Sequence, residues 1–290
     1  MSSAVIIAAG EFPRKPYPLY LLQSATRIVC CDGAFAGYLR RMLKLFGGAE
    51  RLPDAVVGDM DSLPKALQER YSAIIYKESE QDDNDQTKAV RYVLTHYPEV
   101  SEIHILGATG RRADHTIGNL SLLMEYPRLF ATLPVASVAE GCRCSETPFS
   151  GVAASLRPLP QSAASSAKAD NLHLAGPSPC PCPGVDTLAA AAPSFATASG
   201  ALAPLPSIDI VSDYGTAFAI FDSVELHVGA GRRVSLFSPD NSLQIRSEGL
   251  QWPTDGVVFD NWWKATLNRA TADVVRLTFS HPSRALVILD

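Results

Sequence analysis

Short apolar runs alternate with helical periodicity over residues 1–131. Runs typical of buried strands occur at Val5–Ile7, Ile28–Cys30, Ala55–Val57, Ile74–Ile75 and Ile103–Leu106. Apolar residues at helical spacing predict helices near Ala34–Leu45, Pro64–Tyr71, Gln86–Thr95 and Ile117–Glu125. Strands that alternate with helices usually form parallel sheets. The pattern therefore predicts an α/β N-terminal domain with a doubly wound parallel sheet.

The pattern changes after Ile208, where short strands follow one another without any helical period. Turn residues such as Gly229, Gly231 and Pro253–Gly256 separate them. The predicted strands are Thr216–Phe221, Val224–Val228, Val234–Phe237, Leu243–Arg246, Val274–Phe279 and Ala285–Ile288. We therefore expect residues 208–290 to form a C-terminal all-β sandwich domain.

Between these two parts, residues 132–207 are rich in Ala, Ser, Pro and Gly and contain no Ile, Met, Trp or Tyr. Such a composition buries too little apolar surface to offset the entropy of ordering the chain. We expect a disordered insertion here. The sequence leaves open whether it is a genuine insertion or a gene-model artefact such as a retained intron.

Charge and hydropathy exclude several classes of function. The net charge is −5 and no run of Lys or Arg occurs, so we expect neither nucleic acid nor an anionic membrane as a partner. No apolar stretch is long enough to span a bilayer. The N-terminal residues lack the positive charge of a signal peptide and resemble a first strand. A cytoplasmic protein is the expectation.

Carboxylates gather in two segments beside predicted strands. Asp59 and Asp61 follow the strand at Ala55–Val57, while Asp82 and Asp85 precede a predicted helix. Two carboxylates about 4 Å apart repel by roughly 4 kcal/mol at an effective dielectric constant near 20, so a cluster needs a cation. Oxygen ligands favour Mg²⁺, and Lys88 could neutralise phosphates. An acidic segment before a helix can also be a solvated N-terminal cap, and that interpretation stays open.

A third segment, Gly107–His115, joins a predicted strand to the next helix. Its glycines let backbone N–H groups approach a phosphate, and Arg111 and Arg112 add forked donors. Gly-rich turns are common, so this loop alone indicates little.

Taken together and in this order, three segments resemble the signature of the thiamin pyrophosphokinases: Gly58–Ser62, Gln81–Lys88 and Gly110–His115. The resemblance covers about Ala4–Arg128 and resumes at Ile208–Asp290. It implies transfer of a pyrophosphoryl group from ATP to the hydroxyl of thiamin, with Mg²⁺ as cofactor. The metal ligands it implies are Asp59, Asp61 and Asp85, with Asp82 as a further ligand or a partner of one.

The resemblance also implies roles for the remaining polar residues of these segments. Lys88 and Arg112 would stabilise charge on the phosphates. The nucleotide and phosphate pocket would be lined by Asp32, Gln81, Thr87, Asp114 and Asn119.

In the C-terminal part, Gly249–Trp252 resembles the Gly-Leu-x-Trp segment whose Trp packs on thiamin in this family. An aromatic face suits a cationic thiazolium, although Trp252 could equally be a core aromatic residue. The family usually has Ser-Asn in the loop before the penultimate strand. Here leucine stands where that serine would be, so Thr266 or Asn268 would have to supply the polar contact.

Two other functions remain open at this point. A metal-dependent nucleotide-sugar glycosyltransferase would explain Asp59 and Asp61 but not the other matches. A catalytically idle thiamin- or nucleotide-binding protein would explain the missing serine. Because the phosphate-handling residues all precede residue 132 and the thiamin contacts all follow residue 208, we expect a homodimer with shared active sites.

Overall fold

The computed structural model describes residues 2–131 and 205–290. The insertion expected at 132–207 therefore lies almost wholly outside the described residues. The elements of the N-terminal part are β1 (Ser2–Ile7), α1 (Pro16–Ser24), β2 (Arg27–Cys31), α2 (Asp32–Leu45), β3 (Ala55–Gly58), α3 (Lys65–Arg70), the 3₁₀ turn η1 (Ser72–Ile74), β4 (Ile75–Lys77), α4 (Asp85–His96), β5 (Val100–Leu106), α5 (Ala113–Leu122) and α6 (Tyr126–Leu129). The C-terminal part has β6 (Ser207–Ser212), β7 (Gly215–Ile220), β8 (Val224–His227), β9 (Arg233–Phe237), β10 (Ile245–Glu248), β11 (Ala265–Arg269), β12 (Val274–Phe279) and β13 (Ala285–Leu289).

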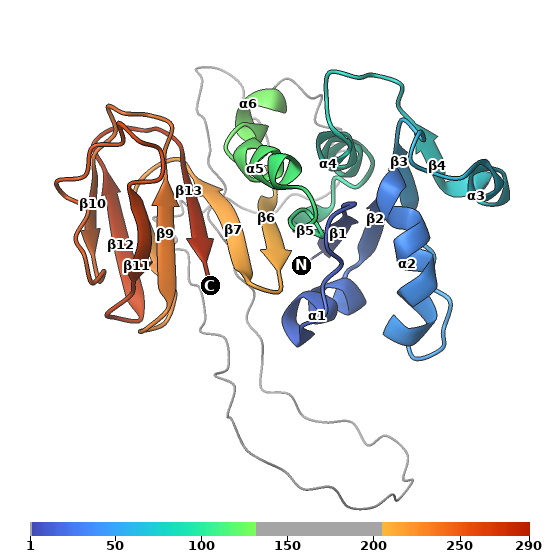
Figure 1. Cartoon of the computed structure of the whole chain (residues 1–290), viewed down its shortest axis with the longest axis horizontal. Coiled ribbons are helices and arrows are strands. Elements are labelled where there is room, and N and C mark those ends of the chain that lie inside the picture. The colour runs from blue at the N-terminus through green and yellow to red at the C-terminus, as the bar shows by residue number, and fades with distance from the viewer. Residues whose placement is uncertain (1, 132–204) are drawn as a thin grey trace, which may run out of the picture.

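One ten-stranded sheet runs through both parts, in the order β11-β9-β13-β7-β6-β5-β1-β2-β3-β4 (Figure 1). From β6 to β4 all neighbours pair in parallel, as predicted for a doubly wound sheet. The central strands β1, β2 and β3 are buried at successive positions, so both of their faces are covered. The helices gather over this half (Figure 1).

The other end of the long sheet is antiparallel and forms one layer of the predicted sandwich. Strands β7, β13 and β9 share an apolar core with the separate three-stranded sheet β10-β12-β8. The two sheets therefore enclose a second core, distinct from the core of the α/β half. The sandwich is thus a continuation of the parallel sheet, joined to it where β6 pairs in parallel with β5 and antiparallel with β7.

Four helices and strands are absent from the sequence prediction, the short helix α6 among them, and two are displaced. Helix α1 contains two prolines near its start, and β11 was interpreted as a loop. Strand β6 begins at Ser207, at the edge of the low-complexity segment. Helix α5 begins at Ala113 instead of near Ile117, and β10 begins two residues later than predicted, because the turn at Pro239–Ser242 extends into the apolar pattern.

Two polar contacts tie the halves of the chain together. The carboxylate of Asp213, in the β6–β7 turn, accepts hydrogen bonds from the backbone N–H groups of Arg14 and Lys15 at 2.9–3.0 Å, just before α1. Arg284, in the β12–β13 connection, forms an ion pair with Glu125 at the start of α6. These contacts hold the sandwich in a fixed place relative to α1 and α6.

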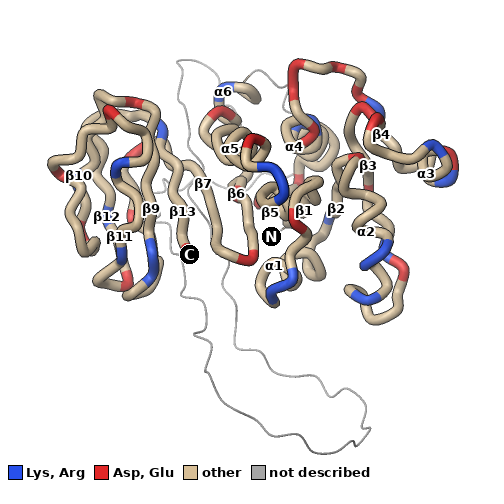
Figure 2. The backbone as a smooth tube through the Cα atoms, in the orientation of Figure 1, with Lys and Arg blue, Asp and Glu red and all other residues tan. Residues whose placement is uncertain are grey.

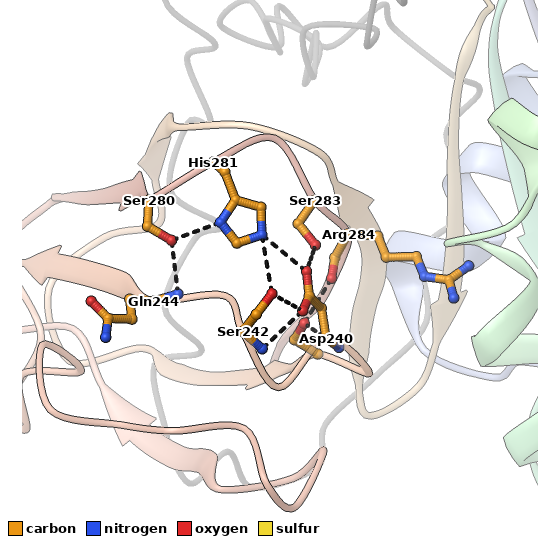
Figure 3. A network of polar contacts seen from close by, with 8 residues as sticks. Asp240, Ser242, Gln244, Ser280, His281, Ser283 and Arg284 are labelled. Atoms are coloured by element: carbon orange, nitrogen blue, oxygen red, sulfur yellow. Dashed lines mark hydrogen bonds and ion pairs between the residues drawn. The ribbon is translucent and has the colours of Figure 1, made fainter.

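A hydrogen-bond network centred on Asp240 closes one end of the sandwich (Figure 3). Its carboxylate accepts bonds from the hydroxyls of Ser242 and Ser283, both at 2.6 Å, and lies 3.1 Å from Nε2 of His281. These hydrogen bonds, those from the two serines first, hold the pKa of Asp240 far below its usual range. The network fastens the β9–β10 and β12–β13 connections to each other.

Within the described part of the chain, none of the helices combines the length and the apolar character that crossing a bilayer would require.

Candidate active site

Three carboxylates meet at the edge of the sheet where parallel strands end. Asp32 follows β2 directly, Asp59 follows β3, and Asp85 begins α4. Gly58 lies between them: a Cβ built there would be 2.9 Å from Cγ of Asp32 and 3.2 Å from Oδ1 of Asp85. The absence of a side chain at Gly58 is therefore what lets these two carboxylates approach each other. Ligands of open α/β sheets bind at this carboxyl edge.

The local backbone arises from the sequence around the acidic residues. Asn84 caps α4 by accepting a hydrogen bond from the N–H of Thr87 at 2.9 Å, which points the helix N-terminus and Asp85 toward the cluster. Met60 has a φ of 70°, a conformation that is costly for a side chain without a local reason. It turns the chain so that the N–H of Asp61 donates to Oδ1 of Asp59 at 2.9 Å.

The electrostatics of the cluster differ between its members. Burial, followed by the charges of Asp32 and Asp59, raises the pKa of Asp85 to about 6. Burial is also the main reason why the pKa of Asp32 is raised. The pKa of Asp59 is lowered instead, chiefly by the N–H of Asp61, and Lys88 adds to this. Such crowding of carboxylates disfavours their charged forms until a cation arrives.

Lys88 lies on α4 one turn beyond Asp85 and is only 1% exposed. Its charge lowers the pKa values of both Asp59 and Asp85. Lys88 forms no ion pair within 4.0 Å with any carboxylate among the described residues. A buried ammonium group without a close carboxylate beside an acidic cluster is available for an anionic ligand.

The structure brings only some of the predicted metal ligands together. Asp61 and Asp82 are exposed, and the backbone N–H of Asp82 is bonded to Glu80. Among residues 2–131 and 205–290, no three His, Cys, Asp or Glu side chains converge closely enough to hold a metal ion by themselves. A cation here would need further ligands from a substrate or water. That is the usual manner of Mg²⁺, which binds through one or two carboxylates plus phosphate oxygens.

Basic groups lie at the start of α5, on a stretch that Figure 2 shows in blue, while the β4–α4 connection carries red acidic segments. Arg112 pairs with Asp114 through two hydrogen bonds, at 3.1 and 2.5 Å. This pairing lowers the pKa of Asp114 to about 2. Both side chains are exposed, so a phosphate could compete for the guanidinium.

The remaining predicted pocket residues form a supporting network. Gln81 donates to Oδ2 of Asp59 at 3.4 Å. Asn119, on α5, accepts from Asn84 at 3.0 Å and donates to the carbonyl of Ala108 at 2.8 Å, which ties the cap of α4 to the loop after β5. Thr87 is buried behind them.

The predicted thiamin-binding residues occupy the β10–β11 connection and β11. Trp252 is 57% exposed, and its backbone N–H and carbonyl are both bonded to the side chain of Asn268, at 3.1 and 2.6 Å. Asn268 is buried and so fixes the backbone that carries Trp252. Leu267 has a φ of 60° and is 80% exposed at a bulge in β11, beside the half-buried Thr266. The core interpretation of Trp252 is therefore wrong.

Sequence reasoning missed two features of the cluster. Asp32 was assigned to the nucleotide pocket, yet it lies against Asp85 and also accepts from the N–H of Ser62 at 3.3 Å. The sequence shows Gly58 at the end of a predicted strand, but not that it lets two carboxylates approach each other. The signal that could have indicated the roles of Asp32 and Gly58 is a carboxylate directly after one buried strand, beside a second strand that ends in glycine.

The fold and the site define a two-domain class: an α/β domain with an acidic site at the carboxyl edge of its parallel strands, continued by a β-sandwich. Two family models match this chain. The catalytic domain of thiamin pyrophosphokinase matches residues 19–135, and its substrate-binding domain matches residues 215–287. Together they span more than half of the sequence, and the chain belongs to the thiamin pyrophosphokinase family.

Individual relatives match over part of their length. Thiamine pyrophosphokinase 2 of Arabidopsis thaliana is 37% identical over 140 residues, which cover 43% of this chain and 51% of the relative. Thiamine pyrophosphokinase 1 of Oryza sativa subsp. japonica is 30% identical over 141 residues, which cover 43% and 53%. The chain thus spans about half the length of the curated relatives it matches.

Solved structures agree on the fold. Thiamin pyrophosphokinase from Candida albicans superposes with a TM-score of 0.61 at 13% identity, covering 99% of this chain and 88% of that one. Thiamine pyrophosphokinase from Bacillus subtilis gives 0.59 at 14% identity, with coverage of 100% and 99%. The α/β domain followed by a sandwich is confirmed. Nothing in these comparisons supports a glycosyltransferase or an idle binding protein.

Proposed function

We propose that this chain transfers a pyrophosphoryl group from ATP to the hydroxyl of thiamin, giving thiamin diphosphate and AMP. The observation that carries the proposal is the meeting of Asp32, Asp59 and Asp85 around Gly58, with Lys88 behind them, in a chain that matches both domains of the family. Three carboxylates held together against their own repulsion suit a cation and the phosphates that it carries.

Mg²⁺ fits the donor set. The pKa of Asp85 is raised to about 6 by burial and by neighbouring carboxylates, which is the signature of a site short of positive charge. Asp59 and Asp85 would hold the ion, with Asp61 and Asp82 able to reach it from exposed positions. When bound, it would neutralise charge on the β- and γ-phosphates.

The chain's own residues would carry out the remaining work. The hydroxyl oxygen of thiamin bonds to the β-phosphorus of ATP, the bond from that phosphorus to the oxygen shared with the α-phosphate breaks, and AMP leaves with that electron pair. The hydroxyl proton is released to solvent or to a carboxylate. Lys88 and Arg112 would stabilise charge on the phosphates during this step. Gln81 and Asn119 would hold Asp59 and the α4 cap in place.

A coupled assay of AMP release from ATP tests the activity, run with and without thiamin. We expect AMP to form only when thiamin is present, together with one thiamin diphosphate for each AMP. Release of ADP, or release of AMP that is independent of thiamin, would contradict the proposal.

The thiamin site would be supplied by a second copy of the chain. Trp252 and Thr266 lie at or beside β11, whereas the carboxylates follow β2 and β3, seven and eight positions along the same sheet. At about 4.8 Å per strand this separation is roughly 35 Å. The reacting atoms must come within about 3.5 Å. Trp252 and the carboxylates of one chain are therefore too far apart to share a substrate pair.

The surface of the same segment supports a partner. Five large apolar side chains between residues 252 and 267 are about half exposed or more: Trp252, Val258, Trp262, Trp263 and Leu267. Aromatic residues gathered on an otherwise soluble surface are typical of a protein interface. We infer a homodimer in which the β11 end of one chain faces the carboxylates of the other.

Mixing two inactive variants tests the shared site. Asp61→Asn removes an acidic residue from one half-site, and Trp252→Ala removes the aromatic face from the other. If sites are shared, mixed dimers hold one site with both lesions and one with neither, so up to about half of the activity per mixed dimer should return. Failure of every mixture, with mixed dimers demonstrated by differently tagged chains, would contradict sharing.

A further inference from the structure

The connection between β4 and α4, Glu78–Asn84, has no helix or strand of its own, although it carries part of the acidic site (Figure 2). Gln81 lies within it and donates to Oδ2 of Asp59 at 3.4 Å, and Asp85 follows directly at the start of α4. A misplacement of about 1 Å at such a site can lower a rate about 100-fold. Side-chain contacts therefore have to fix the path of this connection.

Arg91, on α4, holds both ends of the connection. Its Nη1 donates to Oε1 of Glu78 at 2.6 Å, and its Nη2 donates to Oδ2 of Asp83. Arg91 lies about two turns after the cap residue Asn84, on the same face of the helix. Long side chains on a helix lean toward its N-terminus, which brings the guanidinium back to the connection. All three charged groups are partly buried, so salt screens their attraction less than it screens exposed pairs.

Each end of this clamp continues to the carboxylate site through the backbone. The N–H of Glu78 donates to the carbonyl of Gly58 at 2.9 Å, and Gly58 is the residue around which the carboxylates meet. Asp83 precedes Asn84, whose side chain caps the helix that Asp85 begins. A movement of either anchor would therefore displace a part of the site.

The middle of the connection is held by Glu80. One of its oxygens, Oε1, accepts hydrogen bonds from the backbone N–H groups of Asp82 and of Asp83, the latter at 3.0 Å. These acidic side chains repel one another at close range, and the guanidinium of Arg91 supplies the opposite charge beside them. Without it, the connection should open outward.

We propose that Arg91 is a positioning residue for the metal and phosphate site. It holds the β4–α4 connection so that Gln81 and Asp85 face Asp59, and it touches neither the metal nor the substrate. The proposal rests on the proposed function only in taking Mg²⁺ with ATP as the ligands. A forked guanidinium suits the task because it can pair with two carboxylates at once, whereas the single ammonium group of lysine is a point charge.

Removing the guanidinium has two opposed effects on a cation nearby. By Coulomb attraction alone, the loss of a positive charge favours the binding of Mg²⁺ to the acidic site. The loss of the clamp lets the connection move, which weakens the binding of Mg²⁺. Weaker binding after Arg91→Met therefore has the sign that positioning predicts and that a change in charge alone does not.

Titration with Mg²⁺ in the presence of α,β-methylene-ATP tests the proposal, because this analogue keeps the phosphates but cannot be cleaved between the α- and β-phosphorus. We expect Arg91→Met to bind Mg²⁺ at least tenfold more weakly. Arg91→Lys keeps the charge but only one contact, and should weaken binding about two- to fivefold. In the metal-free chain, the backbone amides of residues 79–84 should exchange hydrogen faster in Arg91→Met.

Arg27→Met is the matched control. Arg27 also bridges two carboxylates, Asp54 at 3.2 Å and Glu99 at 3.1 Å, and its side chain is 37% exposed against 30% for Arg91. It begins β2, at the end opposite to Asp32. Arg27→Met should lower Tm about as much as Arg91→Met and leave the binding of Mg²⁺ within twofold of the parent.

Glu78→Gln cuts one arm of the clamp, so the double variant with Arg91→Met should bind Mg²⁺ no more weakly than Arg91→Met alone. In turnover, Arg91→Met should raise the Mg²⁺ concentration for half-maximal rate about tenfold and keep kcat at saturating Mg²⁺ within about threefold. If Arg91→Met does not fold, Arg91→Lys and Glu78→Gln carry the same test.

Three results would overturn the proposal: unchanged or tighter binding of Mg²⁺ in the Arg91 variants, additive losses in the double variant, or an equal loss in Arg27→Met. The last would assign the effect to general destabilisation. Because the titrations contain no thiamin, absence of thiamin-dependent AMP release would refute the proposed function and leave the result on Arg91 standing.

Discussion

Replacing Gly58 by alanine should disable the carboxylate site without unfolding the protein. The added methyl carbon would lie 2.9 Å from Cγ and 3.1 Å from Cβ of Asp32, and 3.2 Å from Oδ1 of Asp85. Carbon atoms in contact prefer about 3.5 to 4.0 Å, so the Asp32 carboxyl group has to retreat by about 0.6 Å or more. The φ of 155° at Gly58 is also one that residues with a side chain rarely adopt.

The expected loss follows from that displacement. A misplacement of about 1 Å can lower a rate about 100-fold, so we expect kcat/KM for ATP to fall by roughly 10- to 100-fold, equivalent to about 1.4 to 2.7 kcal/mol. Overpacking of this kind costs about 1 to 3 kcal/mol of stability, which lowers Tm by several degrees. The KM for thiamin should change less than kcat/KM for ATP, because in the proposed shared site the thiamin contact is made by Trp252 of the second chain and not by Asp32 or Asp85.

The assay is coupled AMP release at several Mg²⁺ concentrations, together with a thermal melt. Gly118→Ala is the matched control, since a Cβ there meets nothing within 4 Å and the residue lies within α5. If Gly58→Ala kept kcat/KM within twofold of the parent and the same Mg²⁺ dependence, the close approach of Asp32 and Asp85 would not matter for function, and our reading of the site would be refuted.

Three further predictions concern single groups. Asp59→Asn or Asp61→Asn should lower turnover about a thousandfold or more with an unchanged melt; near-normal rates at saturating Mg²⁺ would reject the metal assignment. The pKa of Asp85 is raised to about 6, so its protonated form stabilises the metal-free chain at low pH, and this contribution is lost as the pH rises through 6. Mg²⁺ should therefore raise Tm more at pH 7.5 than at pH 5. The variant Asp85→Asn should remove most of this difference between the two pH values. The pKa of Asp240 is depressed, so its contribution to stability is present above about pH 4 and is lost as the pH falls further. Asp240→Asn should lower the free energy of unfolding in urea by about 1 to 2 kcal/mol at pH 7, and by less in acid. The control Asp255→Asn, at an exposed ion pair, should lower it by under about 0.5 kcal/mol.

Much of the α/β half could be predicted from sequence because its signals are local. Val56 and Ile105 sit in apolar runs whose length and turn residues indicate buried strands, and Asn84 with Asp85 begins a helix in the expected place. The resemblance in three segments then indicated the family, which the domain comparisons bear out. Lys88 was indicated as a charge for phosphates because it lies in the second of these segments, Gln81–Lys88.

Tertiary structure decided what depends on strands that are distant in sequence. That β6 joins the parallel strands and continues them into the sandwich depends on pairing with β5, more than 100 residues earlier, and no local pattern carries that information. The approach of Asp32 to Asp85 across Gly58 depends on the register of β2 with β3. The hydrogen bonds between the Asn268 side chain and the backbone of Trp252 depend on how β11 lies beside the loop after β10. Sequence specifies the side chains and their local conformation, but burial and electrostatic repulsion act between neighbours in space, which only the paired strands bring together.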